Sequence, residues 1–364
     1  MRPRFTGGVG LLCLLLAAPL SAIDQDGQIT LPPGFRIATF ASGLRNPRFM
    51  AISPKGDLFA SLSISGRVVA LPDLDGDGRA DLSRKVLDGL DRPHGLAFHQ
   101  GYLYVAENSR ILRFRQEARY AFGGREVVVP SLPKDGGHWT RTIRFGPDGK
   151  LYASVGSSCN ACVEDDQRRA AILRYNSDGT GEQIYAKGLR NAVGIAFHPQ
   201  TGELWATENG RDWLGDDLPP DELNRIKEGA HYGWPYCYGQ RVVDDQFRKT
   251  EFCRTTEPAA LEFPAHSAVL GLAFYTGSMF PQEYQGDLFV ASHGSWNRSV
   301  PTGRKIFRVR MKDGRPERWE EFATGWLGQS GGWGSPVDVI VGPDGALYVS
   351  DDHAGLIYRI TYRR

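Results

Sequence analysis

The chain has 364 residues, 41% of them hydrophobic and 23% charged, which is the composition of a globular protein and excludes a disordered chain. Its 44 glycines and 22 prolines favour many turns between short strands over a helical bundle. Without the first 22 residues, which hold Arg2 and Arg4 but no acid, Lys and Arg fall from 43 to 41 against 42 acids. This balance excludes a strong electrostatic reason to expect nucleic acid or an anionic membrane as partner.

The N-terminus has the pattern of a secretory signal. A basic "MRPR" precedes the apolar "GLLCLLLAAPL" and the small-residue "LSA", so we expect cleavage after Ala22 and a single mature domain over 23–364. The apolar run is short for a bilayer span, and no later stretch is apolar enough to be one. We therefore expect a periplasmic or secreted protein; an uncleaved N-terminal anchor is the alternative.

One phrase recurs along the chain: a short apolar strand, a tight turn, and a second strand that resembles "LYVA". Six copies occur, and they are PRFMAISPKGDLFAS, PHGLAFHQGYLYVAE, TRTIRFGPDGKLYAS, AVGIAFHPQTGELWATE, VLGLAFY…GDLFVAS and PVDVIVGPDGALYVSDD. Third strands such as "AILRY" and "LIYRI" follow most copies, and no long helical period interrupts them. The repeat predicts an all-β fold, a six-bladed β-propeller with antiparallel four-stranded blades.

The opening strand "FRIATFASGL" lies outside this repeat and is expected to close the ring as the outer strand of the last blade. Uneven spacing between the copies indicates insertions in blades 4 and 5, over Glu208–Ser267 and His293–Trp333.

An acidic loop lies between the first two copies. "PDLDGDGRADL" places Asp73, Asp75, Asp77 and Asp81 at positions one, three, five and nine of an EF-hand-like loop, although Arg84 stands where Glu is expected. Acids with this spacing can surround a hard cation, so we predict a structural calcium site. The alternative is a solvated Asp/Gly turn.

The loops that lead into the innermost strands of a propeller gather around its axis at one face. We call them the approach loops, and here they are rich in His, Arg, Asn and Trp. These residues are Arg45, Arg92, His94, His138, Arg190, Asn191, His266 and Trp333. Such a ring predicts a pocket for an anionic or polar ligand.

Four cysteines follow the signal, and an even number in an exported chain suggests two disulfides. Sequence order favours Cys159–Cys162 and Cys237–Cys253. A CxxC pair can also be a redox motif or half of a zinc site, but there is no second CxxC.

Four stretches of the chain resemble the soluble pyrroloquinoline quinone (PQQ) dependent sugar dehydrogenases of the glucose/sorbosone type, with the sorbosone branch closer. They are LRNAVGIAFHP, ENGRD…GDDLPPDELNRI…HYGWPYCYG, LFVASHGSWNR and PVDVIVGPDGALYVSDDHAGLIYRI. The resemblance covers nearly all of the mature chain and implies oxidation of a sugar or sugar-derived aldehyde. No haem-attachment CxxCH occurs, so a separate electron acceptor is expected.

The resemblance also implies roles for individual residues. His138 matches the general base that takes the proton of the sugar hydroxyl, since an imidazole titrates near neutrality. Arg190 and Asn191 match an Arg-Asn pair that contacts the quinone. The further cofactor contacts that we expect are His94, His293, Trp296, Arg298 and Lys305. The structural alternatives are a hydrogen-bonded His138, an Arg190 that spans two blades and a Trp296 that packs a blade.

In this family the counterparts of Gly210 and Arg211 offer backbone carbonyls to a calcium ion that also binds PQQ. Asp212, Asp217 and Asp221 are candidate direct or surrounding ligands of that ion. The alternative is that these acids only cap turns and pair with Arg211 and Arg225.

The chain departs from the family pattern at two positions. Ser157 stands where the glucose branch has an Asp that supports the base, so His138 must be oriented by another group, for which we consider Glu164, Asp165 and Asp166. Ser335 replaces an Arg that is frequent in the sorbosone branch. These departures keep open a redox-inactive propeller that binds carbohydrate or protein. A calcium-dependent lactonase ranks third, because the approach loops offer mainly His and Arg rather than Asn, Asp and Glu.

Overall fold

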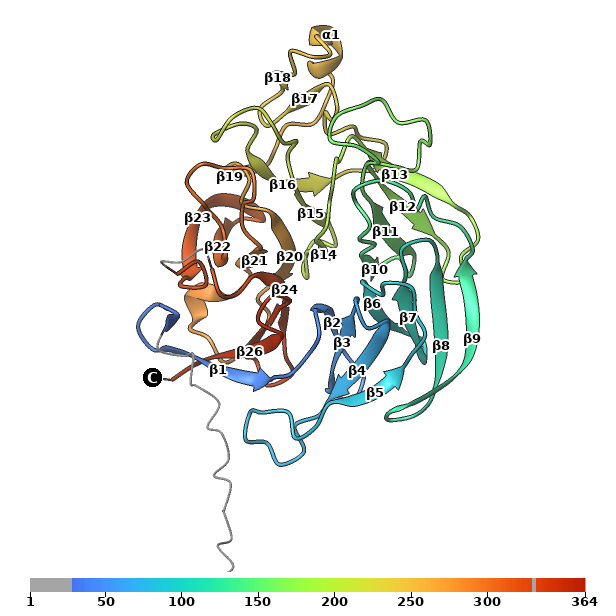
Figure 1. The fold of residues 1–364 in the computed structure, drawn as a ribbon, viewed down its shortest axis with the longest axis vertical. Helices are drawn as coiled ribbons and strands as arrows, with labels where there is room; N and C mark the ends of the chain where they lie inside the picture. Colours follow the sequence, from blue (N-terminus) through green and yellow to red (C-terminus); the bar gives the residue numbers. More distant parts are fainter. Residues whose placement is uncertain (1–27, 329–331, 364) are drawn as a thin grey trace, which may run out of the picture.

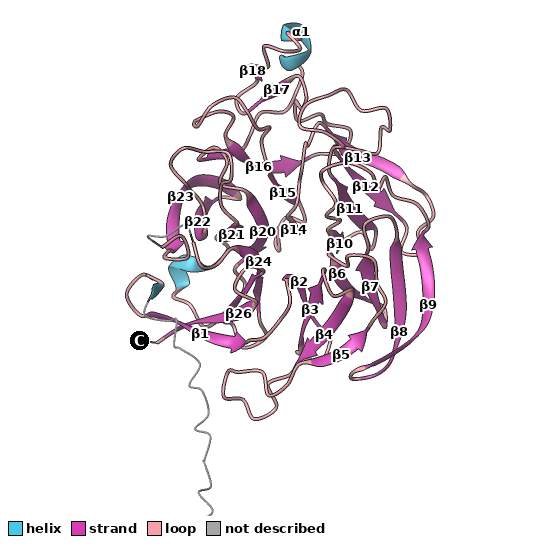
Figure 2. Cartoon of the chain, in the orientation of Figure 1, coloured by secondary structure: helices cyan, strands magenta, loops and turns pink. Residues whose placement is uncertain are grey.

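The computed structural model describes residues 28–328 and 332–363, so the expected signal sequence lies outside the described residues. Six antiparallel four-stranded sheets stand around a central axis, which confirms the predicted six-bladed propeller (Figure 1). The innermost strands of neighbouring blades contact one another all round the ring. Figure 2 shows how little helix accompanies the strands.

The blades use the strands in chain order from the axis outward, except where noted below. Blades 1 to 3 consist of β2 (Pro47–Ile52), β3 (Leu58–Leu62), β4 (Arg67–Leu71), β5 (Arg84–Leu87); β6 (Leu96–His99), β7 (Tyr102–Ala106), β8 (Ile111–Ala118), β9 (Ala121–Val129); and β10 (Ile143–Phe145), β11 (Leu151–Val155), β12 (Ala171–Tyr175), β13 (Gln183–Lys187). Blades 4 to 6 consist of β14 (Ile195–Phe197), β15 (Leu204–Glu208), β16 (Asp221–Ile226), β19 (Leu261–Phe263); β20 (Val269–Phe274), β21 (Leu288–Ser292), β22 (Lys305–Lys312), β23 (Arg315–Ala323); and β24 (Pro336–Val341), β25 (Leu347–Asp351), β26 (Leu356–Tyr362), β1 (Phe35–Ala41).

The N-terminal strand β1 pairs with β26 and supplies the outer strand of blade 6, as expected. The aromatic side chain of Phe35 packs edge-on against Phe280, Phe322 and Tyr362, at centroid distances of 4.8 to 4.9 Å. The closing strand is therefore fixed by a buried aromatic cluster as well as by its ladder, and it covers the sheet edge of β26.

The turn of the repeat has a local chemical cause. In "GPDGKLY" the Asp148 carboxylate accepts from Lys150 N at 3.1 Å and from Tyr152 Oη at 2.9 Å, while Gly149 supplies a φ of 71°. Asp344 makes the same two contacts in blade 6, with Ala346 and Tyr348. The Asp-Gly pair thus sets the hairpin and the tyrosine of the next strand holds it.

Hydroxyl side chains on the second strands join neighbouring blades. Ser61 donates to the His94 carbonyl at 2.8 Å, Thr207 to the Leu270 carbonyl at 2.6 Å and Ser350 to the Arg48 carbonyl at 2.6 Å. Each bond ties a blade to the innermost strand of the next blade or to the approach loop just before it, so the start of that strand is held in place.

The predicted insertions are divided by blade strands. Within Glu208–Ser267, the added segments are the β15–β16 loop at 209–220 and residues 227–260, with β17 (Cys237–Tyr238), β18 (Val242–Val243) and α1 (Thr250–Cys253). The second insertion holds β22 and β23 between the loop at 293–304 and the segment that leads to β24. A 3-10 turn spans Gln282–Tyr284 in blade 5. No helix within the described residues is long and apolar enough to cross a membrane.

Candidate active site

The approach loops of blades 2 and 3 and the start of β2 meet at the indole of Trp139. The His94 ring lies 5.6 Å from it, and the guanidinium groups of Arg48 and Arg92 each lie 5.6 Å from its centroid. Blades 1, 2 and 3 therefore join at one end of the channel. At the other end, a cavity of about 500 Å³ is lined by all six innermost strands. That cavity is mainly apolar and holds none of the predicted site residues.

His138 is held by Ser157. Its Nδ1 lies 3.0 Å from the Ser157 carbonyl oxygen and 2.9 Å from Ser157 Oγ, whose own hydroxyl donates to the Cys159 carbonyl at 2.6 Å. Both oxygens can then only accept, so the proton of the neutral ring is on Nδ1 and Nε2 keeps a free lone pair. Within the described residues, no hydrogen-bond partner is found for that Nε2.

The surroundings of His138 keep its ring neutral. Burial together with the nearby Arg190 lowers the pKa of His138 to about 3, and Arg141 and Arg169 act in the same direction. A neutral imidazole with an unprotonated Nε2 is the state that a general base needs before it takes a proton.

Arg190 is buried and fully engaged with protein acceptors. Its Nε and Nη2 reach the backbone and side-chain oxygens of Asn160 at 3.0 and 2.9 Å, and Nη1 reaches the Gly210 carbonyl at 2.8 Å. An ion pair to Asp212 at 2.9 Å completes the set. Its neighbour Asn191 places Oδ1 beside Gly156, where a Cβ would also meet His138. The structure thus brings His138, Arg190 and Asn191 together.

Several guanidinium groups at this mouth lack a counter-ion. In the part of the chain that the structure describes, no carboxylate pairs with Arg92, Arg141 or Arg169. Burial, Arg169 and Arg92 lower the pKa of Arg141 to about 9. His94 Nε2 and Arg48 Nε are moreover buried without a hydrogen-bond partner. This surplus of positive charge and free polar atoms fits an anionic cofactor with several carboxylates, as PQQ has.

The acidic stretch after β15 is built around protein donors. The Gly210 carbonyl and Asp212 bind Arg190, while Asp221 accepts from Gly210 N at 3.0 Å and Ala268 N at 2.6 Å. Burial raises the pKa of Asp221 to about 6. Arg211 pairs with Asp244 at 2.7 Å. These oxygens therefore already accept from a guanidinium, and a calcium ion at the Gly210 carbonyl would have to share that oxygen with Arg190.

The predicted cofactor contacts of blade 5 are dispersed. His293 Nε2 lies 2.8 Å from Asp352, which also binds Arg48 at 2.6 Å, so these three residues belong to the mouth. Arg298 instead pairs with Asp217 at 3.0 Å. Lys305 lies on β22 and pairs with Glu321 of the outer strand β23, so it is not brought to the mouth.

The ring of Trp296 is 68% exposed and lies against Trp213 rather than over the mouth residues. His94 is fully buried between Phe49 and Trp139, so only its unpartnered Nε2 remains as a possible contact.

The acidic loop between β4 and β5 gathers three of its four acids. Ligand oxygens of Asp73, Asp75 and Asp81 lie within 4.8 Å of one another, whereas Asp77 does not join them and instead caps Arg79 N at 2.7 Å. Among the described residues, Asp212, Asp217 and Asp221 form no such cluster.

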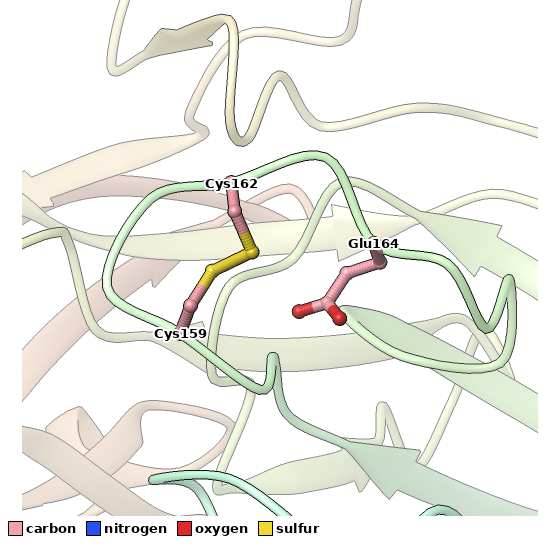
Figure 3. Close-up of side chains that lie close together, drawn as sticks. All are labelled: Cys159, Cys162 and Glu164. Carbon is pink, nitrogen blue, oxygen red and sulfur yellow. A yellow bond between two sulfur atoms is a disulfide. The ribbon is translucent and has the colours of Figure 1, made fainter.

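Both predicted disulfides are present, Cys159–Cys162 and Cys237–Cys253. The first closes a short loop beside the site, and Figure 3 shows the Glu164 carboxylate directed toward it. Glu164 binds Ser158 N and Oγ at 2.6 and 2.7 Å and does not contact His138. The suggestion that an acid of this segment orients the base is therefore wrong, and Ser157 holds the ring.

Three residues of the site, Asn160, Glu208 and Glu222, were not predicted from the sequence. Asn160, inside the CxxC loop, holds both Arg190 and Asp212 N. Glu208 and Glu222 face each other across β15 and β16; burial and Glu222 raise the pKa of Glu208 well above its usual value. An "E" in each of two adjacent strands was visible in the sequence, but the register that pairs them was not.

Comparison with known proteins places the chain among quinoprotein relatives. It matches the TrAA12-like family over residues 29–363. A Borreliella burgdorferi protein of uncharacterised function is 31% identical, with 96% of this chain and 95% of that protein covered. A PQQ-dependent pyranose dehydrogenase of Coprinopsis cinerea is 24% identical over 92% of this chain, which spans only 54% of that enzyme's length.

Two solved structures agree with the fold. The holo form of the PQQ domain of the Coprinopsis cinerea pyranose dehydrogenase has a TM-score of 0.80 at 22% identity, with 92% and 97% of the two chains covered. The calcium structure of a Trichoderma reesei family AA12 enzyme has a TM-score of 0.83 at 20% identity, with 95% and 100% covered.

The chain belongs to the TrAA12-like family. The resemblance to PQQ-dependent sugar dehydrogenases that its motifs indicated is thereby confirmed, while the sorbosone branch stays a prediction.

Proposed function

We propose that this protein is an exported PQQ-dependent dehydrogenase that oxidises a sugar or a sugar-derived aldehyde and passes the electrons to a separate acceptor. The observation that carries this proposal is the Nδ1 contact of His138 with Ser157, which leaves Nε2 unprotonated, in a mouth where Arg92, Arg141 and Arg169 have no carboxylate partner among the described residues. Relatives described as PQQ-dependent pyranose dehydrogenase and aldose sugar dehydrogenase support the substrate class. The disulfides are in keeping with an oxidising compartment.

In this proposal His138 Nε2 takes the proton of the substrate hydroxyl, while Ser157 accepts from Nδ1–H and stabilises the imidazolium that forms. Bound PQQ would supply the acceptor for the hydride. Arg92 and Asn191 would hold its carboxylate and carbonyl oxygens, together with Arg48 and His293. Arg141 and Arg190, whose guanidinium groups are bonded to protein acceptors, would add positive charge.

Calcium belongs to the proposal in a narrower form than the sequence suggested. The Gly210 carbonyl accepts from Arg190, and the proposed proton transfer to His138 does not require a cation there. We propose a calcium ion for the loop of Asp73, Asp75 and Asp81, where the oxygens already converge. A relative solved in a calcium form supports testing for this cation.

The test is a titration of the purified apoprotein with PQQ, followed by reduction of a dye with a panel of sugars. We expect quinone absorbance to shift at micromolar PQQ, and no binding at tens of micromolar would sink the proposal.

His138→Gln should lower kcat by about 10²- to 10⁴-fold, because it removes the base, while PQQ affinity is retained. His99→Gln, on β6 where the ring stacks on Phe145 away from the mouth, is the matched control and should retain turnover. Equal turnover in His138→Gln and the wild type would show that another group is the base.

A second candidate is a redox-inactive propeller that binds carbohydrate. The full engagement of Arg190 by protein acceptors favours it, because a cofactor has to compete for that guanidinium. PQQ binding without dye reduction on any sugar would support this alternative.

A further inference from the structure

Two loops at the rim of the mouth are tied together. They are the β15–β16 loop at 209–220 and the β21–β22 loop at 293–304, which we call the rim loops. Arg298 pairs with Asp217 at 3.0 Å and donates to the Asp216 carbonyl at 2.5 Å, while Ser299 N donates to Asp216 Oδ1 at 3.0 Å. His266 Nε2 donates to the Gly215 carbonyl at 2.8 Å, which fastens the first rim loop to the start of blade 5.

These loops present two tryptophans to solvent. Trp213 is 69% and Trp296 is 68% exposed, and their ring centroids are 5.1 Å apart at an interplanar angle of 83°. An exposed indole does not gain the free energy that burial would give it. Two exposed indoles on loops that are held by hydrogen bonds and an ion pair form a fixed apolar surface.

The backbone at Trp213 adds a separate observation. Its φ is 71°, in the left-handed region that a bulky side chain rarely adopts. Residues in such conformations persist where the surroundings impose them, and they concentrate at binding and active sites.

The pair stands beside the mouth. Trp213 directly follows Asp212, whose carboxylate binds Arg190. Trp296 lies three residues after His293, which binds Asp352. The two indoles therefore lie on loops of blades 4 and 5 that also carry residues of the proposed oxidation site.

We propose that Trp213 and Trp296 form a carbohydrate subsite that holds a distal pyranose ring of an oligosaccharide or glycoside whose terminal sugar is oxidised. This inference rests on the proposed function and names its substrate class. A pyranose has a face of C–H groups that packs on an indole, and hydroxyl groups around its edge that bond to polar side chains. Asp212, Asp217 and Arg298 provide such polar groups at the rim.

The exposed area of the two indoles favours a sugar over a protein as the ligand. Two indoles that are about two-thirds exposed offer roughly 200–300 Å². A stable protein interface needs about 800 Å² on each partner. A sugar ring is of the right size to cover one indole and touch the other.

The test uses the apoprotein, so it does not depend on PQQ or on turnover. Tryptophan fluorescence is titrated with glucose, cellobiose, cellotetraose and maltotetraose. We expect the Kd to fall by at least tenfold from glucose to one of the tetrasaccharides, and Trp213→Ala and Trp296→Ala each to remove this dependence on chain length. Trp319→Phe, on the outer strand of blade 5, is the matched control and should keep it.

Unchanged melting temperatures would show that the variants are folded. Equal Kd values for glucose and both tetrasaccharides, or tetrasaccharide affinity that survives both alanine substitutions, would overturn the subsite. The subsite would also be overturned if the alanine variants kept their oligosaccharide affinity and lost only the reduction of a protein acceptor. That result would assign the Trp213–Trp296 pair to the binding of a redox partner. Failure of PQQ to bind would contradict the proposed function without changing these binding measurements.

Discussion

At the scale of single residues, one serine decides the state of the candidate base. The Ser157 carbonyl can only accept, and its hydroxyl is already committed to Cys159, so His138 must carry its proton on Nδ1. A carboxylate at this place would additionally favour the charged ring. Ser157 therefore fixes the same tautomer with less stabilisation of the imidazolium, and the neighbouring arginines lower the pKa further.

Ser157→Asp should consequently raise the pKa of His138, because a carboxylate stabilises the charged imidazole. The acid limb of kcat/KM should move to higher pH, and the ring should titrate at higher pH in an NMR titration of the apoprotein. Ser157→Ala keeps the carbonyl acceptor and is the control; its acid limb should stay near that of the wild type. An unmoved limb in a folded Ser157→Asp would contradict the contact.

At the scale of elements, the two disulfides have different tasks. Cys159–Cys162 spans a sequence separation of 3 and holds the loop of Asn160, which binds Arg190. Cys237–Cys253 spans 16 and closes the insertion with α1, away from these contacts. Loop-closure entropy gives about 2 kcal/mol for the short loop and about 3 kcal/mol for the longer one.

Replacing both cysteines of each pair by alanine should separate these tasks. The Cys237/Cys253 variant should lose more stability in urea unfolding, and the Cys159/Cys162 variant should lose more PQQ affinity, because Asn160 no longer fixes Arg190. The prediction fails if PQQ affinity falls equally in both variants.

The acidic loop between β4 and β5 gives a prediction of its own. If Asp73, Asp75 and Asp81 hold calcium, then calcium at 100 times its Kd should stabilise the protein by about 2.7 kcal/mol, measured as a rise in melting temperature. Asp75→Asn should remove most of this rise, and Asp313→Asn, in a surface turn of blade 5, should leave it intact. A rise that is equal in all three proteins would place the cation elsewhere.

At the scale of the whole molecule, closure of the ring buries charge in the channel. Asp338 on β24 accepts from Met50 N at 2.9 Å, which joins blade 6 to blade 1, and its Oδ1 has no partner. Burial raises the pKa of Asp338 to about 6. The native state thus favours the protonated acid more than the unfolded chain does.

This shift predicts a pH dependence of the free energy of unfolding. Between about pH 4 and pH 6 the native protein binds more protons at Asp338 than the unfolded chain, so its contribution falls as the pH rises, by about 3 kcal/mol in total. Asp338→Asn has no ionisation there and should lose this part of the slope in urea unfolding across that range. Ser350→Ala, which removes a neutral contact between the same blades, should keep the slope. Identical slopes in the wild type and Asp338→Asn would contradict the shift.

The sequence by itself determined the propeller. Six copies of one strand-turn-strand phrase specify six blades, because Asp-Gly turns and alternating apolar residues act locally, and the opening strand was left over to close the ring. The approach loops with His138, Arg190 and Asn191 followed from the same count. The CxxC spacing and the spacing of Asp73, Asp75 and Asp81 are equally local.

Only the tertiary structure decided which polar groups meet. The engagement of Gly210 and Asp212 by Arg190, the position of Lys305 beside Glu321 and the pairing of Glu208 with Glu222 depend on strand register and blade packing, which join residues far apart in the chain. The Trp213–Trp296 pair and the tautomer of His138 have the same cause. A carbonyl or carboxylate oxygen can bind a cation, an arginine or a backbone N–H. Which of these it binds depends on which one lies within about 3 Å, and the order of residues along the chain does not specify that distance.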